Sequence, residues 1–103
     1  MIITVFRSRL MPGVEAEYGT MAAEMSRLAS SMSGFVGEKT FVADDGERVT
    51  IVLFADADSQ RAWRDHPAHR RAQECGRTAL YSGYSVYSAA VTYSASHRSD
   101  AVS

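Results

Sequence analysis

Apolar residues along this chain follow two periodicities, one typical of strands and one typical of helices. Residues 2–10 (IITVFRSRL) are rich in β-branched and apolar residues, which predicts a strand, and a Pro-Gly pair follows it. From Val14 to Met32 the apolar positions are separated by four and three residues, the spacing of one helix face. Gly34 is expected to end this helix in a left-handed conformation.

The rest of the pattern predicts five further elements. Two apolar runs separated by the turn sequence DDG predict a β-hairpin of residues 35–43 and 49–55. The next apolar positions fit a short helix before Pro67 and a second helix from Pro67 to about Leu80. The Tyr-rich residues 84–93 predict the last strand.

The resulting order, β-α-β-β-α-β, predicts a ferredoxin-like α+β fold with an antiparallel sheet and the helices on one face. The predicted strands are apolar on both faces, so the second sheet face also needs a cover. A second copy of the sheet related by two-fold symmetry would provide it, and we therefore expect a homodimer. We assign residues 1–94 to one domain and the polar residues 95–103 to a disordered tail.

Composition narrows the class of partner. The chain has 103 residues, 46% of them hydrophobic, which suits one compact domain. Its net charge of −1 does not favour a nucleic-acid or membrane partner held by bulk electrostatics. No apolar run is long enough for a membrane span, no signal-peptide pattern opens the chain, and the single Cys75 excludes an intrachain disulfide. We expect a cytoplasmic protein with Cys75 buried between helix and sheet.

Residues 54–86 (FADADSQRAWRDHPAHRRAQECGRTALYSGYSV) carry most of the candidate chemistry. Trp63 has two interpretations, a core anchor between helix and sheet or a pocket wall that stacks on an aromatic ligand. His66 either terminates the short helix through a backbone hydrogen bond or acts as a base at the mouth of a pocket. No third ligand of suitable spacing accompanies His66 and His69, so no metal site is predicted.

The tyrosines and Arg77 also have two interpretations each. Tyr84 shares a predicted sheet face with Val86, and Tyr87 shares the other face with Tyr93. One pair is expected to face the helices and the other pair the dimer interface. The two-residue alternation of side chains along a strand does not determine which pair faces which side. Arg77 either reaches a ligand carboxylate or phenolate, or pairs with a carboxylate of its own chain or of the second protomer.

Over about residues 2–93 the chain resembles the antibiotic biosynthesis monooxygenase family. The resemblance rests on the GFV opening of the second strand, the third strand VTIVLFA, the Ala-Trp pair at 62–63, and the run HPxHxxAQxxGR that ends at Arg77, followed by Tyr81, Tyr84 and Val86. It implies a dimeric α+β barrel of ferredoxin-like protomers, each with a pocket between sheet and helices. The best-studied members oxidise polycyclic phenols without flavin, haem or metal. Because a phenolate can itself give an electron to O₂, the protein need only bind the ring, help to remove its proton and exclude water.

The resemblance fits the catalytic positions of the family only in part. A haem-degrading branch uses a helix His, an Asn and a Trp. Trp63 matches that Trp, but Gln73 stands at the position of the ligand His and Ser8 near that of the Asn, which disfavours haem degradation. In the phenol-oxidising branch a strand-three Asn and Trp correspond to Thr50 and Phe54. Thr50 can still donate a hydrogen bond, whereas Phe54 cannot.

We therefore expect a cofactor-independent monooxygenase that oxidises a small aromatic phenol or quinol with O₂ in an apolar pocket. The alternative is a non-enzymatic small-molecule-binding or structural homodimer of the same fold, with haem degradation third. No cofactor, metal, nucleic-acid or membrane partner is expected. The catalytic candidates are Trp63, His66, Thr50 and Tyr84, and the substrate-binding candidates are Phe6, Met25, Phe54 and Arg77.

Overall fold

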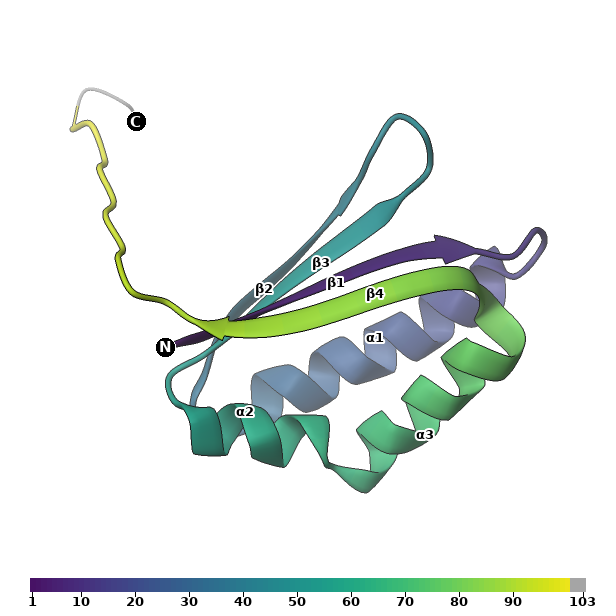
Figure 1. Ribbon diagram of the computed structural model, residues 1–103, viewed down its shortest axis with the longest axis horizontal. Coiled ribbons are helices and arrows are strands. Elements are labelled where there is room, and N and C mark those ends of the chain that lie inside the picture. Colours follow the sequence, from purple (N-terminus) through teal and green to yellow (C-terminus); the bar gives the residue numbers. More distant parts are fainter. Residues whose placement is uncertain (101–103) are drawn as a thin grey trace.

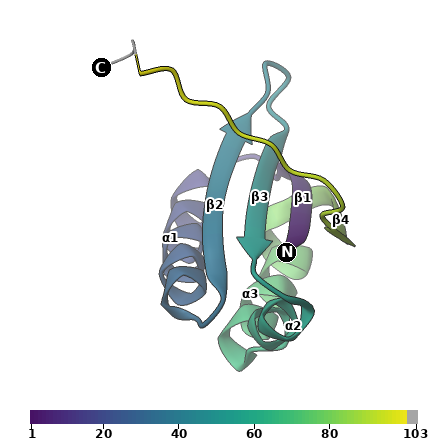
Figure 2. The same cartoon turned by 90° about the vertical axis from the view of Figure 1, so that its left-hand side faces the viewer.

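A four-stranded antiparallel sheet carries all the helices on one face in the computed structural model, which describes residues 1–100 (Figure 1). The strands are β1 (Ile2–Leu10), β2 (Phe35–Val42), β3 (Arg48–Phe54) and β4 (Tyr81–Ala90). The helices are α1 (Glu15–Ser31), α2 (Ala57–Arg64) and α3 (Pro67–Cys75), and α3 continues into a π-helical turn, Gly76–Leu80. The strands lie side by side in the order β2-β3-β1-β4 (Figure 2), so the predicted ferredoxin-like fold is confirmed.

Local sequence signals explain where several elements begin and end. Gly34, between α1 and β2, has a φ of +84°, the left-handed conformation that was expected there. Asp56 caps α2, because its carboxylate accepts the backbone N–H of Ser59 at 2.8 Å. Pro67 occupies the first turn of α3, where its missing N–H costs nothing.

The last strand begins at Tyr81 and ends at Ala90, so the predicted range of 84–93 is wrong at both ends. The π-helical turn delivers the chain to the sheet edge earlier, and a bulge at Ser82 of β4 lets Leu10 pair with Tyr81. Tyr93 lies beyond the strand with 82% of its surface exposed, so it does not share a sheet face with Tyr87.

Residues 91–100 contain no helix or strand and run away from the sheet (Figure 1). Residues 101–103 of the predicted tail lie outside the described residues. The disorder of residues 95–103 stays a prediction. Within residues 1–100, no helix has the length and apolar character that crossing a bilayer requires.

Strand register assigns each side chain to one of the two sheet faces. On the helix-covered face, Phe6 pairs with Thr50 of β3 and Val86 of β4. Because successive side chains alternate, the uncovered face carries the neighbouring row of Val5, Ile51 and Tyr87. The alternation of side chains in the sequence left open which tyrosines face the helices, and the strand register now assigns them. Tyr84 and Val86 face the helices, and Tyr87 faces away from them.

The apolar core occupies one end of the space between sheet and helices. Phe54 is fully buried, with its ring centroid 5.9 Å from that of Phe35 and 5.3 Å from that of Trp63. Within residues 1–100 the buried apolar side chains of this core are Ala29, Val52, Phe54 and Trp63, and Leu80 is buried separately at the end of the π-helical turn. Such a small core is what a chain of this length is expected to bury.

Candidate functional site

A cavity of about 390 Å³ occupies the other end of the space between sheet and helices. Side chains from all four strands and all three helices line it, and its apolar walls are Phe6, Met21, Ala22, Met25, Ala72 and Val86. Tyr84 and Val86 on the edge strand β4 are 43% and 54% exposed, so the cavity is accessible along that edge.

Hydroxyl and carboxylate groups form part of the cavity floor on β2 and β3. The Oγ1 atoms of Thr40 and Thr50 are 2.8 Å apart and form a cross-strand hydrogen bond. Beside them, the carboxylate of Glu38 accepts a hydrogen bond from the hydroxyl of Ser26 on α1, with an oxygen–oxygen distance of 2.5 Å. All four residues line the cavity, so this side can both donate and accept hydrogen bonds.

A second cluster of hydrogen-bonded polar side chains lies between α2 and the sheet. The hydroxyls of Thr4 and Ser88 are 2.7 Å apart, and the amide of Gln60 donates to Ser88 Oγ at 3.4 Å. Thr4 and Gln60 are only 4% and 6% exposed, so these hydrogen bonds offset the cost of burying them. Gln60 and Ser88 line the cavity.

An aromatic cluster forms the wall near the π-helical turn. The Phe6 ring lies 5.4 Å from that of Tyr81 and 5.7 Å from that of Tyr84. Burial raises the pKa of Tyr81 far above its ordinary value of 10. Burial also raises the pKa of Tyr18, against the opposing effect of the Arg48 guanidinium 5.0 Å from its ring. Tyr18 and Tyr81 therefore act as neutral hydroxyls at neutral pH.

Trp63 and His69 form the opposite wall. Their ring centroids are 4.4 Å apart, and both residues line the cavity. The indole Nε1 of Trp63 is buried and has no hydrogen-bond partner in the described part of the chain, a state that costs free energy. His69 Nδ1 lies 3.2 Å from the carbonyl oxygen of Arg64 and 3.1 Å from the amide of Gln73. Burial lowers the pKa of His69, while the Arg64 carbonyl opposes this shift.

The structure brings most of the predicted site residues together. Trp63, Thr50, Tyr84, Phe6, Met25 and Arg77 all line the cavity. Phe54 instead lies behind Trp63 in the core. His66 caps α3, because its Nδ1 accepts the backbone N–H of Ala68 at 3.1 Å. Neither Phe54 nor His66 is part of the cavity wall.

Arg77 lines the cavity mouth and also forms an ion pair with Glu74 one turn earlier. Its side chain is 56% exposed, so the pair contributes little to stability. The hydrogen bond and charge of Glu74 raise the pKa of Arg77. This pairing matches the expectation of a carboxylate partner within the same chain.

Sequence reasoning missed His69, Gln73 and Glu38 as cavity residues. His69 and Gln73 are four residues apart, which places them on one face of α3, and that spacing was the available signal. Cys75 was expected to be buried and is exposed. The buried position belongs to its neighbour Gly76, against which the Tyr81 ring lies so closely that a Cβ would overlap it.

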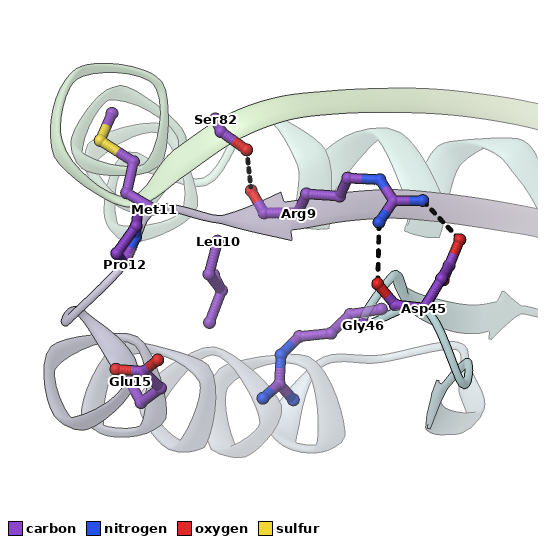
Figure 3. A pocket seen from close by; sticks show the side chains of 9 residues that line it. Arg9, Leu10, Met11, Pro12, Glu15, Asp45, Gly46 and Ser82 are labelled. Atoms are coloured by element: carbon purple, nitrogen blue, oxygen red, sulfur yellow. Dashed lines mark hydrogen bonds and ion pairs between the residues drawn. The ribbon is translucent and has the colours of Figure 1, made fainter.

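A second cavity, of about 350 Å³, lies at the hairpin end of the sheet (Figure 3). Arg9 donates to the backbone carbonyl of Asp45 at 3.1 Å and to its carboxylate at 2.7 Å, and Ser82 donates to the Arg9 carbonyl. These charged groups are half exposed and paired with each other. Among residues 1–100, no cluster of three His, Cys, Asp or Glu side chains could hold a metal ion.

Comparisons with known proteins identify relatives of this chain. The family model for antibiotic biosynthesis monooxygenase matches residues 1–74. The uncharacterized protein YqjZ of Bacillus subtilis (strain 168) is 35% identical over 69 residues, which are 67% of this chain and 60% of YqjZ. The match thus spans about three fifths of that relative.

Solved structures resemble the fold over most of the chain. A mutant of SnoaB, a cofactor-independent oxygenase from Streptomyces nogalater, is 20% identical, with a TM-score of 0.78 over 90% of this chain and 94% of SnoaB. Rv0793 from Mycobacterium tuberculosis is 16% identical, with a TM-score of 0.81 over 92% of this chain and 98% of Rv0793. At such identities the likeness establishes the fold alone.

Proposed function

The chain belongs to the antibiotic biosynthesis monooxygenase family, and on that premise we propose that it binds a small aromatic phenol or quinol beside Trp63 and oxidises it with O₂. The observation that carries the proposal is the accessible cavity of about 390 Å³ with aromatic walls and a hydroxyl-bearing floor. Small-molecule sites are typically cavities of roughly 300–1,000 Å³ with apolar walls and a few placed polar groups.

The proposed chemistry needs no group beyond substrate, O₂ and protein. Loss of the phenolic proton gives a phenolate, which transfers one electron to O₂. The ring radical and superoxide combine into a peroxide, and the proton first removed returns to its outer oxygen. In an anthrone-type substrate the peroxide forms on the CH₂ carbon, and cleavage of its O–O bond and of the remaining C–H bond on that carbon releases water and leaves a carbonyl. One oxygen atom enters the product and the other leaves as water.

Each cavity wall has a defined part in this proposal. Phe6, Met25 and Trp63 hold the aromatic ring and exclude water. Thr50 and Tyr84 hydrogen-bond to its oxygen substituents.

The main alternative is a protein of the same fold that binds a small molecule without turnover. Thr50 and Phe54 stand where the phenol-oxidising branch has Asn and Trp, which supports this alternative. A purely structural role is disfavoured, because the protein's own side chains leave about 390 Å³ of the cavity unoccupied. Haem degradation is disfavoured because Gln73 stands at the position of the ligand His of the haem-degrading branch, and an amide is a poor iron ligand. A Soret shift on haem titration would reverse that judgement.

Oxygen uptake with a panel of anthrones and quinols tests the proposal. We expect wild-type protein to accelerate uptake above buffer, and Trp63→Ala and Thr50→Val to reduce it about tenfold or more. Thr50→Val keeps the side-chain shape, so it carries the test if Trp63→Ala does not fold. Uptake equal to buffer with ligand bound would favour the non-enzymatic alternative.

We also propose that the uncovered sheet face pairs with a second copy of the chain. The row of Val5, Ile51 and Tyr87 is apolar, and Tyr87 is 52% exposed. Sedimentation velocity should show a dimer for wild type and a monomer for Ile51→Lys. Thr20→Lys adds the same charge on exposed α1 and should stay dimeric. A monomeric wild type at micromolar concentration would contradict this proposal.

A further inference from the structure

If the proposed function is right, some group in the cavity wall removes the phenolic proton. The titratable and charged side chains that line the cavity are Tyr18 of α1, Glu38 of β2, Arg64 of α2, His69 of α3, Arg77 of the π-helical turn, and Tyr81 and Tyr84 of β4, whereas β1 and β3 contribute only Phe6 and Thr50. Arginine and tyrosine side chains keep their protons at neutral pH. Only Glu38 and His69 are left as proton acceptors.

The surroundings of His69 determine which ring nitrogen is basic. Its Nδ1 lies 3.2 Å from the carbonyl oxygen of Arg64, in the last turn of α2, where carbonyls lack an intrahelical donor. A carbonyl oxygen can only accept, so the proton of the neutral imidazole belongs on Nδ1. A half-turn of the Gln73 amide, 3.1 Å away, lets its oxygen share that proton. Nε2 then keeps the lone pair.

His69 is also held where an aromatic ligand would lie. Its ring is 4.4 Å from the ring of Trp63, and both line the cavity. Burial favours the neutral imidazole by lowering the pKa, and the charge of His66 acts weakly in the same direction. The neutral form is the one that can accept a proton.

Glu38 is the weaker candidate. Its carboxylate already accepts a hydrogen bond from the Ser26 hydroxyl, so one of its oxygens is engaged with the protein. His66, the other histidine of this region, has its Nδ1 committed to the N-terminus of α3.

We propose that His69 is the catalytic base of this cavity. Its Nε2 takes the phenolic proton of the bound ligand, so that an imidazolium and a phenolate form together. The guanidinium of Arg64 on the same wall stabilises the phenolate, and the imidazolium later returns the proton to the peroxide. Trp63, Arg64 and Gln73 position the base and the ligand.

Binding of alizarin, a hydroxyanthraquinone that lacks the oxidisable CH₂ carbon, tests this inference. Quenching of the single Trp63 reports occupancy, and the visible phenolate band reports loss of the phenolic proton. We expect wild type to enrich the phenolate band at a pH below the ordinary pKa of the dye. The enrichment should fall about tenfold in His69→Gln, which can still donate to the Arg64 carbonyl, while quenching persists.

Matched variants and a direct readout separate a base from a structural residue. His66→Asn keeps a cap on α3 and should retain the phenolate band, because His66 lies outside the cavity wall. Ring ¹⁵N signals of wild-type His69 should show Nε2 gaining a proton as alizarin binds. An unchanged band in His69→Gln with normal quenching, or loss of the band in Glu38→Gln alone, would overturn this inference but not the proposed function. Absence of quenching would overturn both.

Discussion

The space between sheet and helices is packed at one end and hollow at the other. At the packed end the Phe54 ring is enclosed by Phe35 and Trp63, and its side chain is fully buried. At the hollow end, the same sheet face carries Thr40 and Thr50 over a cavity of about 390 Å³. Trp63 belongs to both ends, since one neighbour is Phe54 and another is His69.

The difference shows how one protein layer serves both stability and binding. Apolar side chains on β3 at the packed end gain from close contact with the helices. Hydroxyls and the Glu38 carboxylate at the hollow end would be costly to bury without partners, and the helices leave room there for water or a ligand. Stability and ligand binding should therefore respond separately to substitutions at the two ends.

The largest expected effect is the contrast between Phe54→Ala and Met25→Ala. Removing the buried Phe54 ring leaves a void and should lower the free energy of unfolding by about 3–5 kcal/mol. Met25 already borders empty space, so its truncation should cost only about 1 kcal/mol and chiefly weaken ligand binding. Urea denaturation followed by circular dichroism measures both. Equal losses would mean that the hollow end is closed in solution.

A smaller effect is expected from adding one methyl group at each end. Gly34→Ala places a Cβ against the Ser59 side chain at a φ of +84° and should lower the free energy of unfolding by about 2 kcal/mol. Gly76 has ordinary helical dihedrals, so Gly76→Ala adds no backbone strain, but its Cβ would overlap the Tyr81 ring and should lower that free energy by about 1–3 kcal/mol.

The added Cβ at residue 76 would also displace the Tyr81 ring from the cavity wall. Ligand affinity, measured by Trp63 quenching, should therefore fall several-fold in Gly76→Ala and stay unchanged in Gly34→Ala. The reverse pattern would contradict the separation of the two ends.

The smallest effect is a difference between the two ends in their response to acid. Burial lowers the pKa of His69 below its ordinary value of 6.5. As the pH falls, His69 therefore takes up its proton in the unfolded chain before it does so in the folded protein. Its contribution to the free energy of unfolding is complete above pH 6.5 and is lost as pH falls toward the folded pKa. His69→Gln should flatten the stability curve in that window.

Asp56 at the packed end acts in a lower window. Its carboxylate accepts the Ser59 backbone N–H, which lowers its pKa below 3.8. The stabilisation is present above that value and is lost as pH falls through the lower, folded pKa. Asp56→Asn, which keeps a capping oxygen, should remove this second decline only. Chemical denaturation at stepped pH measures both windows, and a single common decline would contradict the assignment.

Much of the fold could be predicted because its signals are local. The helical spacing from Val14 to Met32 depends only on which side chains face the core. Gly34 and Pro67 act through backbone dihedrals that are properties of the residue itself. The boundary of β4 was missed because the π-helical turn and the β4 bulge are set by contacts between segments far apart in the sequence.

Candidate site residues were predictable where strand register decides their placement. Phe6, Thr50 and Tyr84 alternate with residues of the opposite face, so a correct fold class was enough to bring them together. The histidines were not predictable in this way. His66 and His69 are three residues apart and have the same chemistry, yet one caps a helix and the other stacks on Trp63.

The sequence by itself therefore determined the elements, their order and the family, because periodicity, turn residues and caps act within a few residues of one another. Only the tertiary structure decided which end of the layer is filled, which tyrosines face the helices, and that His69 rather than His66 meets the cavity. Those outcomes depend on how α2 and α3 pack on the sheet. That packing is set by the sum of many weak contacts between segments far apart in the sequence, so no short stretch of residues encodes it.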